Sequence, residues 1–208
     1  MKKSIVILLI GLFFGGMSYS QNETMFVIHT EYGDITGMLY NDTPGHRDNF
    51  IKVVEQGWYD GSIFHRVIKN FMIQGGGAAD GTQDIGYTIP AEFRDNRYHK
   101  KGALAAARMG DAVNPEKRSS GCQFYFVQGQ TFTDAELDAF AIRKNCEWTE
   151  EQRKTYKTIG GTPHLDFDYT VFGEVIDGIE VIDKIAAVKT GYRDKPVEDV
   201  KMTIEIIE

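Results

Sequence analysis

The chain has 208 residues, of which 23 are Lys or Arg and 30 are Asp or Glu, so its formal net charge is −7. This acidic balance disfavours nucleic acids and anionic membranes as partners, because nothing would offset the repulsion from their phosphates. The length is typical of one domain, and a hydrophobic fraction of 42% can form a core of ordinary size. The 22 glycines, together with 13 Phe and 10 Tyr, favour short strands joined by tight turns.

The first twenty residues have the pattern of a bacterial-type secretory signal peptide. Lys2 and Lys3 precede an apolar run over residues 5–17, and residues 18–20 (Ser-Tyr-Ser) follow as a small-x-small cleavage pattern. The run is shorter than the ~20 residues that cross a bilayer, which disfavours the alternative of an uncleaved N-terminal anchor. We therefore predict an exported protein, with the periplasm as its expected compartment and residues 21–208 as its mature domain. Cleavage would remove two lysines and no acidic residue, and so make the protein more acidic.

The mature chain begins with a series of predicted strands. Residues 24–30 and 34–40 alternate between apolar and polar side chains and are expected to form a hairpin. Further strands are expected at residues 62–68, 71–74, 102–108, 123–128, 169–175 and 201–207. This pattern favours a mainly β fold, a closed antiparallel barrel with helices over its openings.

Two helices are predicted beside these strands. The first follows Thr43, a favourable N-cap residue, and starts with Pro44 and ends at Gly57. The second covers residues 178–187, where isoleucines recur at helical spacing on one side. Both helices present an apolar face that can cover one end of a barrel.

Residues 133–159 differ from the rest because their pattern is helical and polar. Thr133 with Glu136, and Thr149 with Gln152, each fit a capping box at the start of a helix. We interpret this segment as two short helices inserted at the surface between strands. A solvated elaboration without function is favoured over a role in binding a partner.

Motifs that serve nucleophilic, metal or nucleotide chemistry are missing from the sequence. Residues 75–77 are three glycines that lack the continuation of a dinucleotide fingerprint, and no phosphate-binding loop or serine nucleophile elbow is found. The five histidines have no metal-ligand spacing. Cys122 and Cys146 leave a disulfide open, since export allows one, but two cysteines are not a disulfide framework. We therefore expect neither a cofactor nor a metal.

The strongest candidate for a site lies in residues 64–76. On a strand, Arg66 shares a face with Phe64, and a hairpin would bring Phe71, Met72 and Gln74 close to this guanidinium. An arginine beside apolar side chains needs an acceptor. From the residues alone, two interpretations stay open: an ion pair with a nearby acid on a barrel rim, or a cation that serves a substrate.

A resemblance to a known family favours the second interpretation. Residues 64–76 (Phe-His-Arg-Val-Ile-Lys-Asn-Phe-Met-Ile-Gln-Gly-Gly) are similar to the central motif of cyclophilin-type peptidyl-prolyl cis-trans isomerases. Three further segments resemble the family in the same order, at residues 102–108, 120–126 and 165–175. The resemblance runs from Met25 to the C-terminus apart from residues 133–159. It implies a closed eight-stranded antiparallel barrel capped by two helices, with a short helical insertion.

The resemblance also implies a role for each matching residue. Arg66 would be the catalytic guanidinium, Gln74 would bond the substrate backbone, and Gln123 would orient Arg66. The proline pocket and the adjoining peptide site would be formed by Phe71, Met72, Ala107, Arg108, Tyr125, His164, Leu165 and Tyr169.

Three of these residues depart from the family pattern. Tyr125 stands where the family usually has Phe, His164 where it often has Trp, and Tyr169 where it often has His. The hydroxyl of Tyr125 would lie on the pocket floor and could reduce or redirect it. These departures leave the rate and the substrate preference open.

The resemblance implies proline-containing polypeptides as partners. From the charge and the signal peptide we expect no nucleic acid and no membrane insertion after signal cleavage, and we expect a monomer. It would accelerate X–Pro rotation in exported proteins and so assist their folding. One alternative is a chaperone module that binds proline segments with little turnover. Another is a carrier with an open barrel lumen, which the 13 Phe and the many Ile disfavour because they would fill it.

Overall fold

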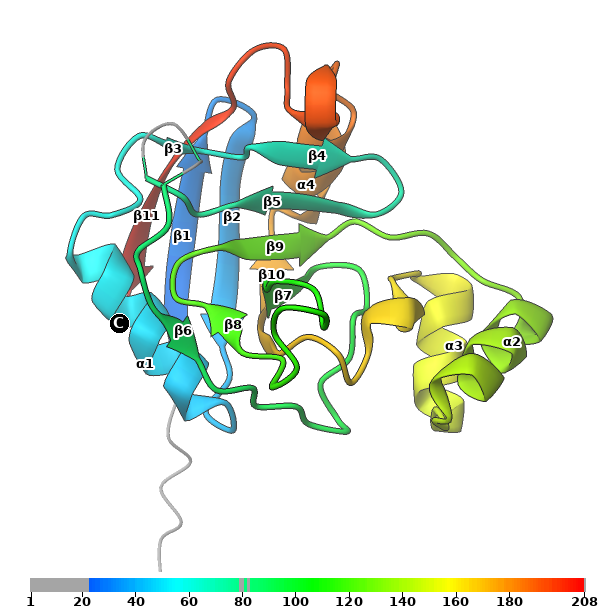
Figure 1. Cartoon of the computed structure of the whole chain (residues 1–208). Helices are drawn as coiled ribbons and strands as arrows, with labels where there is room; N and C mark the ends of the chain where they lie inside the picture. Colours follow the sequence, from blue (N-terminus) through cyan, green and yellow to red (C-terminus); the bar gives the residue numbers. More distant parts are fainter. Residues whose placement is uncertain (1–22, 79–80, 82, 208) are drawn as a thin grey trace, which may run out of the picture.

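A curled antiparallel sheet is the centre of the fold (Figure 1). The computed structural model describes residues 23–78, 81 and 83–207, so the predicted signal peptide lies outside the described residues. Nine strands pair in the order β3-β11-β1-β2-β10-β7-β9-β5-β4, and β6 pairs with β8 in a separate ribbon. Their bounds are β1 Thr24–Thr30, β2 Gly33–Leu39, β3 Ser62–Ile63, β4 Arg66–Ile68, β5 Met72–Gly75, β6 Thr88–Ile89, β7 Ala103–Ala106, β8 Ser119–Ser120, β9 Phe124–Val127, β10 Val171–Asp177 and β11 Lys201–Ile207. The predicted mainly β, antiparallel fold is confirmed.

The two edges of this sheet belong to one stretch of chain. β3 pairs with β11 and β4 pairs with β5, and only Phe64 and His65 separate the two strands. The strand predicted over residues 62–68 is therefore two strands, because the chain turns at this point and its halves pair at opposite ends of the sheet. Within the described strands no ladder joins β3 to β4, so the predicted closed eight-stranded barrel is instead a curled nine-stranded sheet whose edges meet in sequence. The β6–β8 ribbon was not predicted, since two-residue strands carry no periodic signal.

Four α-helices are described around the sheet, and two 3-10 turns lie in the connections. Their bounds are α1 Pro44–Glu55, α2 Asp134–Lys144, α3 Glu150–Thr158, α4 Ile179–Ala186, η1 Pro163–Leu165 and η2 Tyr192–Asp194. The predicted capping helices correspond to α1 and α4, and the predicted insertion corresponds to α2 and α3. Over the described part of the chain, none of these helices combines the length and the apolar character needed to cross a membrane.

The strands at the middle of the sheet are buried on both faces. In β9, Phe124 and Phe126 pack inside the curl with α1 and α4, while Tyr125 and Val127 pack in a second cluster on the outer face. Burial on both faces explains why these strands read as unbroken apolar runs and do not alternate. The outer cluster also contains Met72, and it forms the floor of the candidate site described below.

The insertion leaves and rejoins the sheet at one close backbone crossing. Gln130 and Gly161 form an isolated bridge. A Cβ atom on Gly129 would lie 2.4 Å from the Cα of Gly161, and Gly129 has a φ of +66°. Both the close approach and the left-handed conformation require glycine here.

The insertion is a packed unit with its own small core. The hydroxyls of Thr133 and Thr149 cap α2 and α3 in the capping boxes that the sequence predicted. Leu137 and Tyr156 are fully buried in this core, and Trp148 is nearly so. The prediction of a surface insertion of two helices is confirmed, but part of its surface is buried.

We expect Phe50 of α1 to be a major contributor to stability. Its ring centroid lies 5.4 to 5.7 Å from those of Phe26, Tyr59, Phe124 and Phe172. Phe50→Ala should lower the free energy of unfolding by about 3–5 kcal/mol, because it leaves a cavity in this cluster. Urea denaturation measures the change. The control is Ile142→Ala on α2, where the side chain is 83% exposed and the expected change is within about 0.5 kcal/mol; similar losses in both variants would contradict the prediction.

Candidate active site

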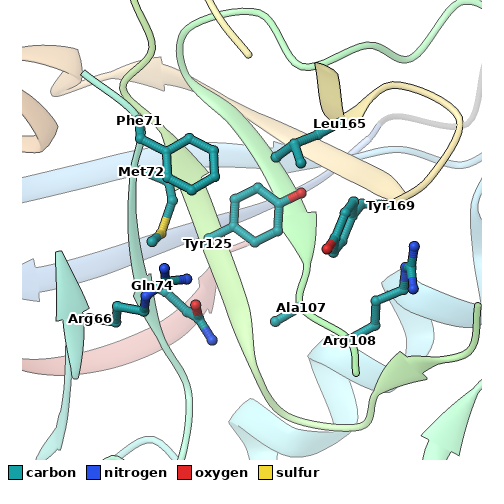
Figure 2. A pocket seen from close by; sticks show the side chains of 9 residues that line it. All are labelled: Arg66, Phe71, Met72, Gln74, Ala107, Arg108, Tyr125, Leu165 and Tyr169. Carbon is teal, nitrogen blue, oxygen red and sulfur yellow. The ribbon is translucent and has the colours of Figure 1, made fainter. Parts of the chain in front are cut away.

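A pocket of about 240 Å³ lies on the outer face of the sheet, at β5, β7 and β9. It is lined by Arg66, Phe71, Met72, Gln74, Ala107, Arg108, Tyr125, Leu165 and Tyr169 (Figure 2). All nine are among the eleven residues that the sequence analysis assigned to the site. The volume is below the roughly 300–1,000 Å³ of small-molecule sites, so the pocket suits one small ring.

Strand register brings these residues together from distant parts of the chain. Arg66 of β4 pairs with Gln74 of β5, which pairs with Tyr125 of β9, which pairs with Ala105 of β7. Directly opposed residues on neighbouring strands point to the same face of a sheet. Arg66, Gln74 and Tyr125 therefore form one row across the sheet, as Figure 2 shows.

Apolar side chains form one wall of the pocket. Met72 is 2% exposed, Phe71 stands beside it (Figure 2), and Leu165 also lines the pocket. His164 does not line the pocket; its ring stacks on Phe71 with centroids 5.5 Å apart and an interplanar angle of 28°. Burial lowers the pKa of His164, and the charge of Lys144 acts in the same direction. His164 is thus a mainly neutral ring that supports the wall from behind.

Arg66 has a partner that the sequence analysis missed. Its Nε donates to Oδ2 of Asp194 at 3.3 Å, and both side chains are about half exposed. Among the described residues this is the hydrogen bond that Arg66 makes, so its two Nη groups are available to a ligand. Gln123, predicted to orient Arg66, accepts a hydrogen bond from Nε2 of Gln74 at 3.1 Å and therefore contacts Arg66's neighbour.

Arg66 does pair with an acid, as one of the two interpretations left open by the residues alone had it, but the pair occupies only Nε and leaves the second interpretation open. Nothing in the sequence pointed to Asp194 in particular, which is 128 positions away. Arg193 and Asp194 both have positive φ angles, of 57° and 61°, which non-glycine residues seldom adopt. This backbone turn presents the carboxylate of Asp194 to Arg66.

The second arginine of the pocket has a different role from the first. Nε of Arg108 donates to the carbonyl oxygen of Asp168 at 2.6 Å, and its guanidinium carbon lies 4.5 Å from the ring centroid of Tyr169. The side chain is only 4% exposed. Arg108 therefore holds Tyr169 in position, and Arg66 is the cation that a ligand in the pocket would meet.

The floor of the pocket carries a hydroxyl group that is hydrogen-bonded from behind. The Tyr125 hydroxyl lies 2.9 Å from Nε2 of His99, and Nδ1 of His99 lies 2.8 Å from Oδ1 of Asp166. Burial raises the pKa of Tyr125 well above its ordinary value, so the phenol stays protonated. His99 and Asp166 were not predicted, because no local pattern relates residues that are far apart in the chain.

A second hollow of about 360 Å³ adjoins the pocket and shares Gln74, Ala107 and Arg108 with it. Gln123 lines this hollow, as do the exposed side chains of Met109 and Val113. Two adjoining hollows with common walls suit an extended ligand with one group in each. Met109 and Val113 were not among the residues predicted for the site.

The groups that the pocket offers are a guanidinium, an amide and phenols beside apolar side chains. Within residues 23–78, 81 and 83–207, no group of three or more His, Cys, Asp or Glu could hold a metal ion. Both cysteines are free, and burial raises the pKa of the Cys122 thiol. The disulfide that the sequence left open is not formed.

Comparison with known proteins agrees with this geometry. Residues 25–205 match the model of the family described as cyclophilin type peptidyl-prolyl cis-trans isomerase/CLD, and the chain belongs to this family. A putative peptidyl-prolyl cis-trans isomerase of Staphylococcus saprophyticus is 36% identical over 193 residues, which cover 90% of this chain and 93% of that protein. The activity is thus the one that the sequence predicted, cis-trans isomerisation of peptidyl-prolyl bonds.

Two further relatives are informative. A putative bifunctional phosphatase/peptidyl-prolyl cis-trans isomerase of Streptococcus pyogenes is 40% identical over 189 residues, but this chain spans only 38% of its length. The crystal structure of a cyclophilin type peptidyl-prolyl cis-trans isomerase of Cryptosporidium parvum matches with a TM-score of 0.67 at 24% identity, over 90% of this chain and 99% of that one. The latter shows that the fold is shared.

Asp194 should affect activity more than stability. Asp194→Ala frees the guanidinium of Arg66 to adopt other orientations, and we expect kcat/KM for a proline peptide to fall about two- to fivefold, the equivalent of ~0.4–1 kcal/mol for an exposed pair. NMR exchange spectroscopy measures the rate.

The matched control is Asp199→Ala, which removes a similarly exposed acid paired with Lys195 at 3.2 Å. It should retain the activity of the unmodified protein. An Asp194→Ala variant as active as this control would show that the ion pair does not orient Arg66.

Proposed function

We propose that the protein accelerates the rotation of X–Pro bonds in exported polypeptides, and that Arg66 is the group that acts on the reacting amide. The observation that supports this most is the position of Arg66 beside an apolar pocket the size of one small ring, with both Nη groups available. A proline side chain is such a ring, and its amide nitrogen would lie at the edge of the pocket.

The chemistry requires a hydrogen-bond donor but no nucleophile. Resonance gives the peptide bond a rotation barrier of ~18–20 kcal/mol. Rotation becomes easier when the prolyl nitrogen turns pyramidal, and a donor directed at this nitrogen or at the neighbouring carbonyl stabilises that state. One charge-assisted hydrogen bond contributes ~1.5–3 kcal/mol, which is a factor of about ten to a hundred in rate.

The apolar wall would increase this effect. Phe71, Met72 and Leu165 would hold the ring and exclude water, and a hydrogen bond from Arg66 is stronger in a region of low dielectric constant. Gln74 lies next to Arg66 in the row across the sheet, where it would bond the substrate backbone. Ala107 and Arg108 line both hollows, so they would contact the residues next to proline.

A polypeptide is the substrate class that the two adjoining hollows suit. The pocket would take the proline ring, and the hollow with Met109 and Val113 would take a side chain nearby in the peptide. We further propose that the protein acts as a monomer and assists the folding of its clients, for which X–Pro isomerisation is slow, taking tens of seconds without a catalyst.

Arg66→Ala should reduce kcat/KM about ten- to a hundredfold and leave the fold intact, because the side chain is 43% exposed and packs little. Arg66→Lys keeps the charge but loses the planar fork, and should recover only part of the loss. Exchange of a proline peptide, followed by NMR, measures both variants.

Arg47→Ala, on α1, removes an arginine that does not line the pocket and should keep full activity. Unchanged turnover in Arg66→Ala would contradict the role of Arg66. A parent protein that binds proline peptides without accelerating exchange would instead favour the alternative of a turnover-poor chaperone module.

We also propose that the protein is exported to the periplasm and that residues 1–20 are removed. Lys2 and Lys3, the apolar run over residues 5–17 and the small residues that follow support this. The family model begins to match at residue 25, so the proposed signal peptide lies outside the domain.

When the full chain is expressed in a Gram-negative host, the periplasmic fraction should contain a protein whose intact mass corresponds to residues 21–208. Leu8→Arg interrupts the apolar run and should keep the full-length chain in the cytoplasm, whereas Lys2→Arg preserves the charge and should not change export. Full-length parent protein in the cytoplasmic fraction would refute the proposal.

A further inference from the structure

The insertion donates two hydrogen bonds to a carboxylate buried below the active-site pocket. Asp166 is 1% exposed. Its Oδ2 accepts hydrogen bonds from Nε1 of Trp148 at 2.8 Å and from the hydroxyl of Tyr156 at 2.5 Å. Its Oδ1 accepts from the backbone N–H of His99 at 2.8 Å and lies 2.8 Å from Nδ1 of the same residue. Two of the four contacts therefore come from residues 133–159.

This carboxylate is connected to the pocket through a single histidine. An ionised carboxylate only accepts hydrogen bonds, so Nδ1 of His99 must be the donor toward Asp166. In a neutral imidazole Nε2 then accepts, and the hydroxyl of Tyr125, 2.9 Å away, donates to it. The two rings are also stacked, with centroids 6.0 Å apart and an interplanar angle of 13°. The direction of the Tyr125 hydroxyl is thus determined by groups behind the pocket.

Every member of this chain of hydrogen bonds is buried. His99 and Tyr156 are fully buried, Tyr125 is 4% exposed and Trp148 is 7% exposed. Apolar side chains could fill the same space without the cost of removing a carboxylate from water. Buried networks of this kind are sensitive to geometry, because each lost donor leaves a polar atom without a partner.

A second set of contacts joins the insertion to the pocket wall. Nζ of Lys144, at the end of α2, donates to the carbonyl oxygen of His164 at 3.0 Å and also pairs with the carboxylate of Asp168. The ring of Phe140 lies 6.0 Å from that of His164. Leu165, which lines the pocket, lies in the chain between His164 and Asp168, the two residues that Lys144 contacts. The insertion therefore supports both the floor and the wall of the pocket.

We propose that the helical insertion, residues 133–159, is a working part of the isomerase site, in which Trp148 and Tyr156 are positioning residues. They act through Asp166 and His99 on the hydroxyl of Tyr125, and so set the shape and polarity of the pocket floor. The inference rests on the proposed function, since it names groups that tune the same site. It replaces the interpretation of the insertion as a solvated elaboration.

The test removes one hydroxyl at a time from two neighbouring tyrosines. Tyr156→Phe deletes a donor to Asp166, and we expect kcat/KM for a proline peptide to fall about three- to tenfold, because the floor of the pocket loses its fixed geometry. Tyr98→Phe is the matched control: its ring packs edge-on against Tyr156 at 5.6 Å, but its hydroxyl bonds Thr155. The control should stay within twofold of the parent protein. An unchanged rate in Tyr156→Phe would overturn the proposal.

A double-mutant cycle separates positioning from general destabilisation. If Tyr156 acts through the hydroxyl of Tyr125, Tyr156→Phe should have little further effect on kcat/KM in a Tyr125→Phe background. An equal loss in both backgrounds would overturn the proposal. Trp148→Phe removes the other donor and serves in place of Tyr156→Phe should the latter not fold.

A spectroscopic readout keeps the inference distinct from the proposed function. In the parent protein and in Tyr156→Phe, the ring nitrogen shifts of His99 and the ring carbon shifts of Tyr125 are measured by NMR without substrate. We expect both sets of chemical shifts to change in Tyr156→Phe and to stay unchanged in Tyr98→Phe. Unmoved shifts would refute the connection even in an active enzyme, whereas a parent protein without turnover would refute the proposed function alone.

Discussion

The register of β9 between β5 and β7 is the constraint on which both the core and the candidate active site depend. Along this strand, Phe124 and Phe126 enter the core while Tyr125 and Val127 enter the outer cluster. A slip of one residue would exchange the two faces. It would remove two phenylalanines from the core and place one of them in the pocket. Because the same register holds Gln74 beside Tyr125, stability and the geometry of the site are selected together.

This constraint explains how much the sequence could predict. Local periodicity was sufficient for most strands and for both capping helices, and the capping boxes at Thr133 and Thr149 located the inserted helices correctly. The single strand predicted over residues 62–68 was wrong in one respect: nothing in the sequence pattern marks Phe64 and His65 as the point where the chain changes partners. A hydrophobic pattern in the sequence indicates which side chains are buried, but it does not indicate which strand they pack against.

The site residues also divide into those that the sequence could predict and those that it could not. Those close in sequence, or carried by a family motif, were predicted, and nine of the eleven line one pocket. The groups that hold them were missed: Asp194 contacts Arg66 across 128 positions, and Asp166 contacts His99 across 67. A supporting hydrogen bond needs only one donor and one acceptor, so it imposes no pattern on the chain around it. Such partners become visible only when the fold brings them together.

The close crossing at Gly129 and Gly161 has a consequence for how this protein can change. The two ends of the insertion are in contact, so segments of other lengths can be exchanged there without moving β9 or β10, as at sites where domain insertion is tolerated. The exchange has one condition. Asp166 remains behind in the host, and it is left without two of its donors when α2 and α3 are removed. A shortened or grafted chain must therefore either bring two new donors to that carboxylate or replace it with an uncharged side chain.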